Sequence, residues 1–242
     1  MISVRALLLR ATPYRDSDLV VDLLTAEHGR LAAIARGARK SRRRFGGVLD
    51  YFNLLHVEMS RGRGGLGSLG SVELLGSWDV LRADVDAYCA GSHLLDLARL
   101  GTREGDAAPE LFRLLLGGLD ALQRGAHPAS LARVFQVQAL ARLGYAPAAC
   151  HCPGCGIALV VAAAGQGVVT CRACAEPTAT TLSAGAVRTL QAAAELLPER
   201  LGALRLTADV AVELVPFLDR ALELALGRRP NSLASLPGFE KG

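Results

Sequence analysis

Four cysteines in two closely spaced pairs constrain this chain more than any other feature of its 242 residues. The pairs are Cys152–Cys155 and Cys171–Cys174, each with two residues between its members and with 15 residues between the pairs. Each pair can present two thiolates to one metal ion from a tight turn, and two such turns complete a tetrahedral site. Four sulfur ligands leave no open coordination position. The spacing therefore predicts a structural Zn²⁺ site, held by Cys152, Cys155, Cys171 and Cys174.

Other interpretations of these cysteines stay open at this point. Reduced thiols are one alternative, and a thioredoxin-like redox pair is another, although the latter needs a single pair at a helix N-terminus in a βαβ unit. Cys150 and His151 could compete as ligands, but Cys150 lies too close to Cys152 in the chain, so we treat it as a spare thiol. Cys89 lies on an apolar helical face and is expected in the core.

A second feature is a dense run of positive charge. Seven basic residues and no acidic one lie between Arg30 and Leu49. Residues 1–80 hold 12 Arg and Lys against 8 Asp and Glu, whereas the rest of the chain holds 15 of each kind. Cations packed this densely repel one another unless an anion neutralises them, and phosphate accepts bidentate contacts from Arg. We therefore predict a nucleic-acid-binding loop formed by Arg36, Arg39, Lys40, Arg42, Arg43 and Arg44. The alternative is a basic loop that contacts only water.

Phe45 closes this basic run, and we expect its ring to stack on a base. Aromatic residues are few in this part of the chain. Charge rather than stacking should therefore lead the binding, which predicts weak sequence preference and strong dependence on salt.

The first 79 residues have the pattern of short strands. The runs Asp18–Thr25 and Leu31–Ala35 flank Gly29, which predicts a hairpin. Further strands are expected at Ile2–Ala11, Leu54–Met59 and Ser71–Leu75. Five short strands predict a small OB-fold β-barrel, with an unspecified β-sandwich as the alternative.

Beyond Trp78 the apolar residues recur with the period of a helix. Pro109 and Pro128 are placed where the first turn of a helix tolerates proline. The expected helices are Ala83–Leu100, Pro109 to about Gln123, Pro128 to near Gly144, Ser183–Leu197 and Thr207–Leu226. Pro216 should kink the last helix, and the tail from Gly227 should fray.

These patterns predict an α+β protein with an N-terminal OB-fold barrel, followed by an α-helical domain that contains the cysteine insert. The expected boundaries are 1–79 for the barrel, 80–149 and 181–242 for the two parts of the helical domain, and 150–180 for the zinc knuckle.

We expect no enzymatic activity. The stretch Gly62–Gly67 matches G-x-G-x-x-G but lacks the βαβ context of a dinucleotide site, so a hairpin loop is expected there. A zinc-dependent nuclease or deaminase would need an open metal position and a nearby Glu, and a four-sulfur site offers no such position. The chain has no apolar run of 18 residues, so we expect a cytoplasmic protein without a transmembrane helix.

The chain resembles the RecO family of bacterial DNA repair and recombination proteins over nearly its whole length. The segment 4–53 (VRALLLRATPYRDSDLVVDLLTAEHGRLAAIARGARKSRRRFGGVLDYFN) is similar to the family's opening, with its Y-x-[DE]-x-D-like turn, its E-x-G-[RK] hairpin and its basic loop. The segment 143–156 (LGYAPAACHCPGCG) is similar to the family's approach to its zinc knuckle, and the alignment puts ligands at Cys152 and Cys155. Ala149 departs from the pattern, because a larger apolar residue is usual there.

The resemblance implies a non-enzymatic recombination mediator. Such proteins bind single- and double-stranded DNA, anneal complementary strands, and act with RecR and the single-strand-binding protein to help RecA load onto coated single strands. By position, the six basic residues of the loop take the DNA-binding role. Some relatives lack the knuckle cysteines, which implies that the metal supports local folding. The alternative function is an OB-fold RNA- or tRNA-binding module with a structural zinc knuckle. In the cell we expect the protein in the cytoplasm, and on the nucleoid when it is bound to DNA.

Overall fold

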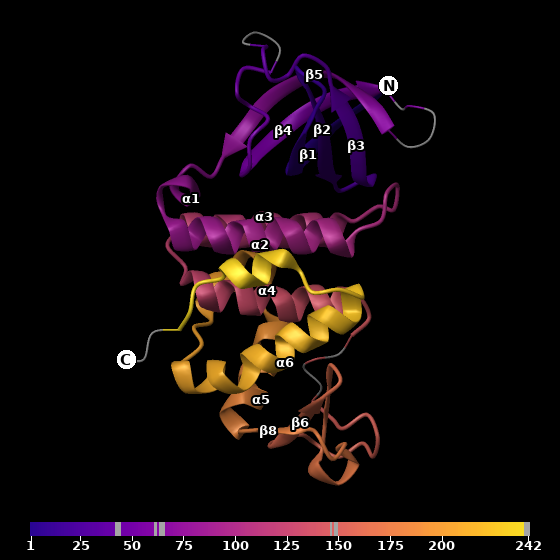
Figure 1. The fold of residues 1–242 in the computed structure, drawn as a ribbon. Coiled ribbons are helices and arrows are strands. Elements are labelled where there is room, and N and C mark those ends of the chain that lie inside the picture. The colour runs from indigo at the N-terminus through magenta and orange to yellow at the C-terminus, as the bar shows by residue number, and fades with distance from the viewer. Residues whose placement is uncertain (42–44, 61, 63–65, 146, 148–149, 240–242) are drawn as a thin grey trace.

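A barrel, a layered helical region and a small cysteine-bearing sheet follow one another along the molecule (Figure 1). The computed structural model describes residues 1–41, 45–60, 62, 66–145, 147 and 150–239. The barrel lies at one end, and the cysteine insert lies at the other (Figure 1). The predicted α+β class, with an OB-like barrel followed by helices, is confirmed.

Five strands close the barrel in the order β1-β2-β3-β5-β4. They are β1 (Ile2–Tyr14), β2 (Asp18–Thr25), β3 (Gly29–Ala35), β4 (Asn53–Ser60) and β5 (Leu66–Ser77). β3 and β5 run parallel, and the other neighbouring pairs are antiparallel. Alternate residues of β3 and β4 are buried, as the period of two in a strand requires. The hairpin predicted around Gly29 is confirmed as β2–β3.

β5 begins at Leu66 rather than at the predicted Ser71. Its first residues pair with β3 and so close the barrel. A Cβ atom on Gly67 would lie 2.5 Å from the end of the Met59 side chain and 2.6 Å from the carbonyl oxygen of Ser60. The glycine that indicated a loop in the sequence thus permits a close approach between strands. Residues 63–65 of the G-x-G-x-x-G match lie outside the described residues.

The helical region contains six described helices, and the predicted ones are confirmed with small shifts in their ends. They are α1 (Val80–Ala83), α2 (Val85–Gly101), α3 (Pro109–Gln123), α4 (Pro128–Arg142), α5 (Ala184–Glu195) and α6 (Ala208–Leu226). α2 starts after Asp84, whose carboxylate accepts a hydrogen bond of 2.8 Å from the backbone N–H of Ala87 and so caps the helix. α4 is buried along Ala129–Leu140, because helices surround it (Figure 1). α6 continues through Pro216 to Leu226.

The C-terminal tail is packed, which corrects the expectation that it frays. A 3₁₀ turn, η3 (Asn231–Ser235), lies against α2. Leu233 is buried, and the Ser232 hydroxyl lies 2.8 Å from Nδ1 of His93 on α2. The Gly, Pro and Ser content of the tail indicated fraying, but its apolar and hydroxyl side chains find partners in the helical core.

The barrel has a hydrophobic core of its own, and a second core joins one side of the barrel to the helices. Phe52, just before β4, is completely buried with Leu81 and with residues of α2. Nε1 of Trp78, just after β5, donates a hydrogen bond of 2.7 Å to a carboxylate oxygen of Asp120 on α3. The barrel is therefore fixed against the helical region by packing and by a polar contact. Within the described part of the chain, no helix is long and apolar enough to cross a membrane.

Candidate metal centre and nucleic-acid interface

The four cysteines predicted as metal ligands come together in the insert. Their sulfur atoms all lie within 4.8 Å of one another. Cys152 and Cys171 are buried, whereas Cys155 and Cys174 are exposed. The insert also holds a three-stranded sheet of β6 (Ala162–Gly165), β7 (Val168–Thr170) and β8 (Thr180–Leu182), in the order β7-β6-β8. The cluster could therefore hold a metal ion that ties the two cysteine turns to each other.

The backbone folds each cysteine pair into a tight turn. The N–H of Gly156 donates to the carbonyl oxygen of Cys152 at 2.8 Å, and Gly156 has a φ of 76°, a conformation that favours glycine. In the second turn the N–H of Cys174 donates to the carbonyl oxygen of Cys171 at 3.1 Å. A Cβ atom on Gly154 would lie only 3.2 Å from the sulfur of Cys174. The first turn is thus shaped to bring the second pair of sulfurs close.

The four thiols affect one another's protonation. The backbone N–H of Cys171, which donates to the sulfur of Cys152 at 3.3 Å, lowers the pKa of the Cys152 thiol to about 6. Hydrogen bonds with Cys171, Cys155 and Cys152 raise the pKa of Cys174 to about 12. Four neighbouring sulfurs cannot all be thiolates without a compensating positive charge, and a divalent ion supplies that charge. The donor set therefore matches a closed four-sulfur metal site.

The other cysteines and the neighbouring histidine lie outside this cluster. The group of four sulfurs includes neither Cys150, which is exposed, nor His151, which forms an isolated β-bridge with Ala158. Cys89, expected in the core, is half-buried on α2.

The basic loop joins β3 to β4 on the barrel. Arg36, Arg39 and Lys40 are exposed, as a phosphate-binding role requires. Arg42, Arg43 and Arg44 lie outside the described residues. The loop is anchored to the β1–β2 turn, because the N–H of Arg39 donates to the carbonyl oxygen of Ser17 at 3.0 Å. The N–H of Gly37 donates to the carboxylate of Asp18 at 2.8 Å.

Phe45 does not have the predicted role. Its side chain is only 2% exposed and belongs to the core of the barrel, together with Leu8, Val57 and Leu69. A ring in that position cannot stack on a base. The physical reason is that removing the apolar Phe45 ring from water stabilises the folded barrel, whereas a ring exposed at the end of the basic loop would give up that stabilisation.

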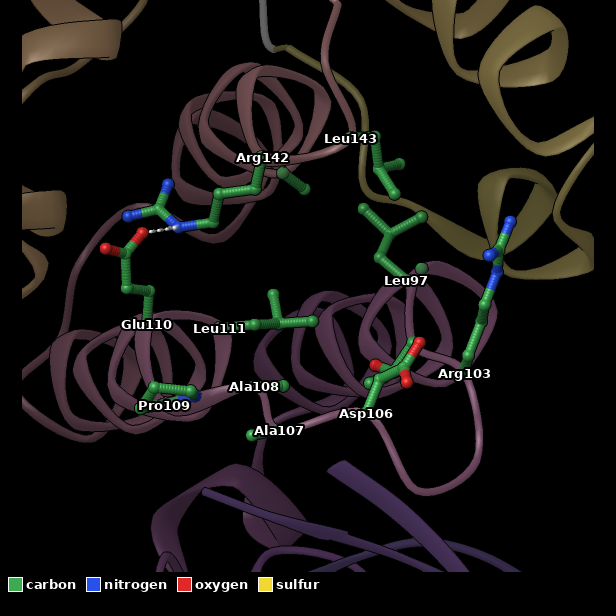
Figure 2. Close-up of a pocket in the computed structure, with 13 residues that line it drawn as sticks. Leu97, Arg103, Asp106, Ala107, Ala108, Pro109, Glu110, Leu111, Arg142 and Leu143 are labelled. Atoms are coloured by element: carbon green, nitrogen blue, oxygen red, sulfur yellow. Dashed lines mark ion pairs between the residues drawn. The ribbon is translucent and has the colours of Figure 1, made fainter. Parts of the chain in front are cut away.

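A cavity of about 610 Å³ lies where the ends of α2, α3 and α4 meet (Figure 2). Leu97, Leu111 and Leu143 form much of its apolar wall. Its charged residues include Arg142 and Glu110, whose side chains approach to 4.0 Å (Figure 2). Partial burial lowers the pKa of Arg142 from its ordinary value, and the nearby Glu110 opposes this shift. No cysteine or histidine lines this cavity, and the Thr102 hydroxyl donates to the carbonyl oxygen of Ala98. The Thr102 hydroxyl is therefore engaged with the backbone of α2.

A histidine, a serine and an aspartate lie in contact elsewhere, but their arrangement is not that of a catalytic triad. The Ser232 hydroxyl donates to Asp96 at 2.9 Å and accepts from Nδ1 of His93. Nε2 of His93 lies 3.1 Å from the side-chain amide of Gln136. The serine, not the histidine, is in the middle, and His93 is completely buried. This network is structural.

Comparison with known proteins gives matches over most of the chain. The family model "Recombination protein O N terminal" matches residues 1–78, and "Recombination protein O C terminal" matches residues 82–234. A protein of Geobacter sulfurreducens named DNA repair protein RecO is 37% identical over 239 residues, which cover 97% of both chains. A protein of the same name from Anaeromyxobacter dehalogenans strain 2CP-1 is 40% identical over 190 residues, covering 75% of this chain and 74% of its own. A third, from Pelobacter propionicus, is 34% identical over 245 residues, covering 96% and 95%.

Proposed function

The chain belongs to the RecO family of DNA repair proteins, and from this premise we propose that it acts as a recombination mediator without an enzymatic active site. In this role it binds single- and double-stranded DNA and anneals complementary strands. With RecR, it helps RecA load onto single strands that the single-strand-binding protein covers. Its place of action is the cytoplasm, on the nucleoid.

The observation that carries the DNA-binding proposal is the exposed basic loop on the barrel. Arg36, Arg39 and Lys40 extend from a loop whose base is held by hydrogen bonds to the β1–β2 turn. The sequence adds Arg42, Arg43 and Arg44 to the same segment. A rigid strand scaffold that displays a cluster of cations is suited to the phosphate backbone, which supplies most of the affinity in binding without sequence preference.

Annealing follows from the same charges. Two complementary strands repel each other through their phosphates, and arginine side chains that neutralise both strands on one surface lower the barrier to pairing. This step needs no bond to be made or broken by the protein.

The metal in this proposal is Zn²⁺, bound by Cys152, Cys155, Cys171 and Cys174. These four sulfurs would occupy every coordination position, so the ion supplies structure and no reaction chemistry. It would hold the two cysteine turns together and so support the packing of the insert on α5 and α6.

A strand-annealing assay tests the proposal directly. Complementary oligonucleotides, one of them fluorescently labelled, are mixed with the protein, with and without the single-strand-binding protein. We expect the protein to accelerate duplex formation in both conditions. Unlabelled RNA of the same sequence, added as competitor, distinguishes DNA binding from the RNA-binding alternative. A site that contacts the 2′-hydroxyl would bind the RNA more tightly than the DNA. Failure to accelerate annealing, or a strong preference for RNA, would reject the proposed role.

A further inference from the structure

The turn between β1 and β2 carries an exposed aromatic ring beside the basic loop. Tyr14 is the last residue of β1, and 40% of it is exposed. The guanidinium carbon of Arg15 lies 5.1 Å from the centre of the Tyr14 ring, which is the geometry of a cation–π contact. The barrel surface therefore presents an arginine and a tyrosine ring as one unit.

This unit and the basic loop form one surface. The N–H of Arg39 donates to the carbonyl oxygen of Ser17 at 3.0 Å, and its guanidinium donates to the carbonyl oxygen of Asp16 at 3.3 Å. The acidic side chains of the turn are Asp16, which is exposed, and Asp18, whose carboxylate binds the N–H of Gly37. Around them Arg15, Arg36, Arg39 and Lys40 are all exposed, so the surface has an excess of positive charge.

The other aromatic rings of the barrel segment are less exposed than Tyr14. Residues 1–80 contain five aromatic side chains, and the structure describes all of them. Phe45 and Phe52 are buried, Tyr51 is half-buried, and Trp78 is buried with its indole N–H bonded to Asp120. Tyr14 is thus the exposed aromatic residue in this segment.

We propose that Tyr14 and Arg15 form a base-stacking platform, on which a base of a bound single strand lies while Arg36, Arg39 and Lys40 bind the neighbouring phosphates. The inference rests on the proposed function, because it assumes that the loop binds nucleic acid. Stacking requires a base that is not already stacked in a duplex, so the platform acts on single strands and contributes little to duplex binding. In this proposal Tyr14 has the base-stacking role that we predicted for Phe45 from the sequence.

The conformation of Arg15 gives a second way to test the platform. Arg15 has a φ of 53°, in the left-handed region that glycine adopts with the least strain. If Arg15 had only a structural role, glycine at this position would stabilise the turn at least as well. Arg15→Gly should therefore leave the melting temperature unchanged or raise it, and yet reduce the affinity for single strands.

The experiment measures affinity for three probes at several salt concentrations: a single-stranded oligonucleotide, the same strand with abasic sites, and a duplex. We expect Tyr14→Ala to lower affinity for the intact single strand about tenfold at every salt concentration, because stacking is not screened by salt. The slope of affinity against salt and the affinity for the duplex should not change. Tyr14→Phe should bind like the wild type. Tyr88→Ala serves as the matched control, because Tyr88 on α2 is also 40% exposed.

The abasic probe keeps the proposal open to refutation even if Tyr14→Ala folds poorly. The wild-type protein should bind the abasic strand about tenfold more weakly than the intact strand. Equal binding of the two strands by the wild type, or equal binding of the intact strand by wild type and folded Tyr14→Ala, would overturn the platform alone. If the wild type binds none of the probes, the proposed function fails, and the platform fails with it.

Discussion

A Cβ atom on Gly29, at the tip of the β2–β3 hairpin, would lie 1.8 Å from the carbonyl oxygen of Asp106 in the loop between α2 and α3. Gly29 also has a φ of 59°. Beside it the N–H of Arg30 donates to the carbonyl oxygen of Arg103 at 3.4 Å, and the N–H of Gly105 donates to the carbonyl oxygen of Arg30 at 3.3 Å. The barrel and the helices therefore meet backbone to backbone at this point, where a side chain at position 29 has no room.

Gly29→Ala should lower the free energy of unfolding by about 3 kcal/mol, through backbone strain and the displacement of the α2–α3 loop. Gly105→Ala is the control, since Gly105 has a φ of 84° but nothing within 4 Å of the added Cβ, so strain alone should cost about 1 kcal/mol. Urea unfolding followed by circular dichroism measures both. Equal losses would contradict the close contact between barrel and helices.

The buried His93 should make the protein less stable in acid. Desolvation by burial, with help from the Arg133 charge, lowers the pKa of His93 to about 3, while Asp96 opposes the shift. Its Nδ1–H donates to Ser232 and its Nε2 accepts from the amide of Gln136, so the ring is neutral and both nitrogens are occupied. A second proton on Nε2 of His93 would face the side-chain N–H of Gln136, which cannot accept a hydrogen bond.

The sign of the pH effect follows from these pKa values. The unfolded chain takes up a proton at His93 near pH 6.5 and the folded chain only near pH 3, so stability is complete above pH 6.5 and falls as the pH drops through this range. Between pH 7.5 and pH 5.0 this residue should account for a loss of about 2 kcal/mol. His93→Gln should remove that part of the pH dependence in urea unfolding. An identical loss in the variant would show that His93 is not the source.

The four-sulfur site should be structural. Cys171→Ser should reduce zinc content and lower the free energy of unfolding by about 2–4 kcal/mol, yet leave strand annealing largely intact if the protein still folds. Cys150→Ser is the control, because Cys150 is exposed and outside the cluster, and it should change neither property. X-ray absorption on the purified wild type should report four sulfur neighbours around zinc. Loss of annealing in a folded, metal-free variant would contradict a structural role.

The sequence predicted those features that depend on local chemistry. Pro109 marked the start of α3, the apolar runs around Gly29 predicted the hairpin, and the cysteine spacing predicted the cluster, because each signal acts within a few residues. It did not predict features that depend on distant partners. Phe45 is buried by strands far from it in the chain, and Ser232 is held by His93 on α2.

The position of β5 shows the same limit. From the sequence alone, Gly67 was assigned to a loop. Only the structure shows that Met59 and Ser60 lie so close to it that a side chain would not fit. The Tyr14–Arg15 pair was also missed, because only the structure shows that the β1–β2 turn is bonded to the basic loop. The sequence shows only that Tyr14 and Arg15 are adjacent, since the first strand was predicted to end at Ala11 and the structure extends it to Tyr14.

The salt dependence of single-strand binding tests the central claim, that the basic loop binds nucleic acid through its charges. If the wild type contacts roughly five phosphates, the slope of log affinity against log salt should be about −3.5. Neutralising Arg42, Arg43 and Arg44 together removes three contacts and should reduce the slope to about −1.4. Neutralising the exposed Arg228 and Arg229, after α6, should change it much less. A wild-type slope near zero, or equal effects of the two sets of substitutions, would contradict the account.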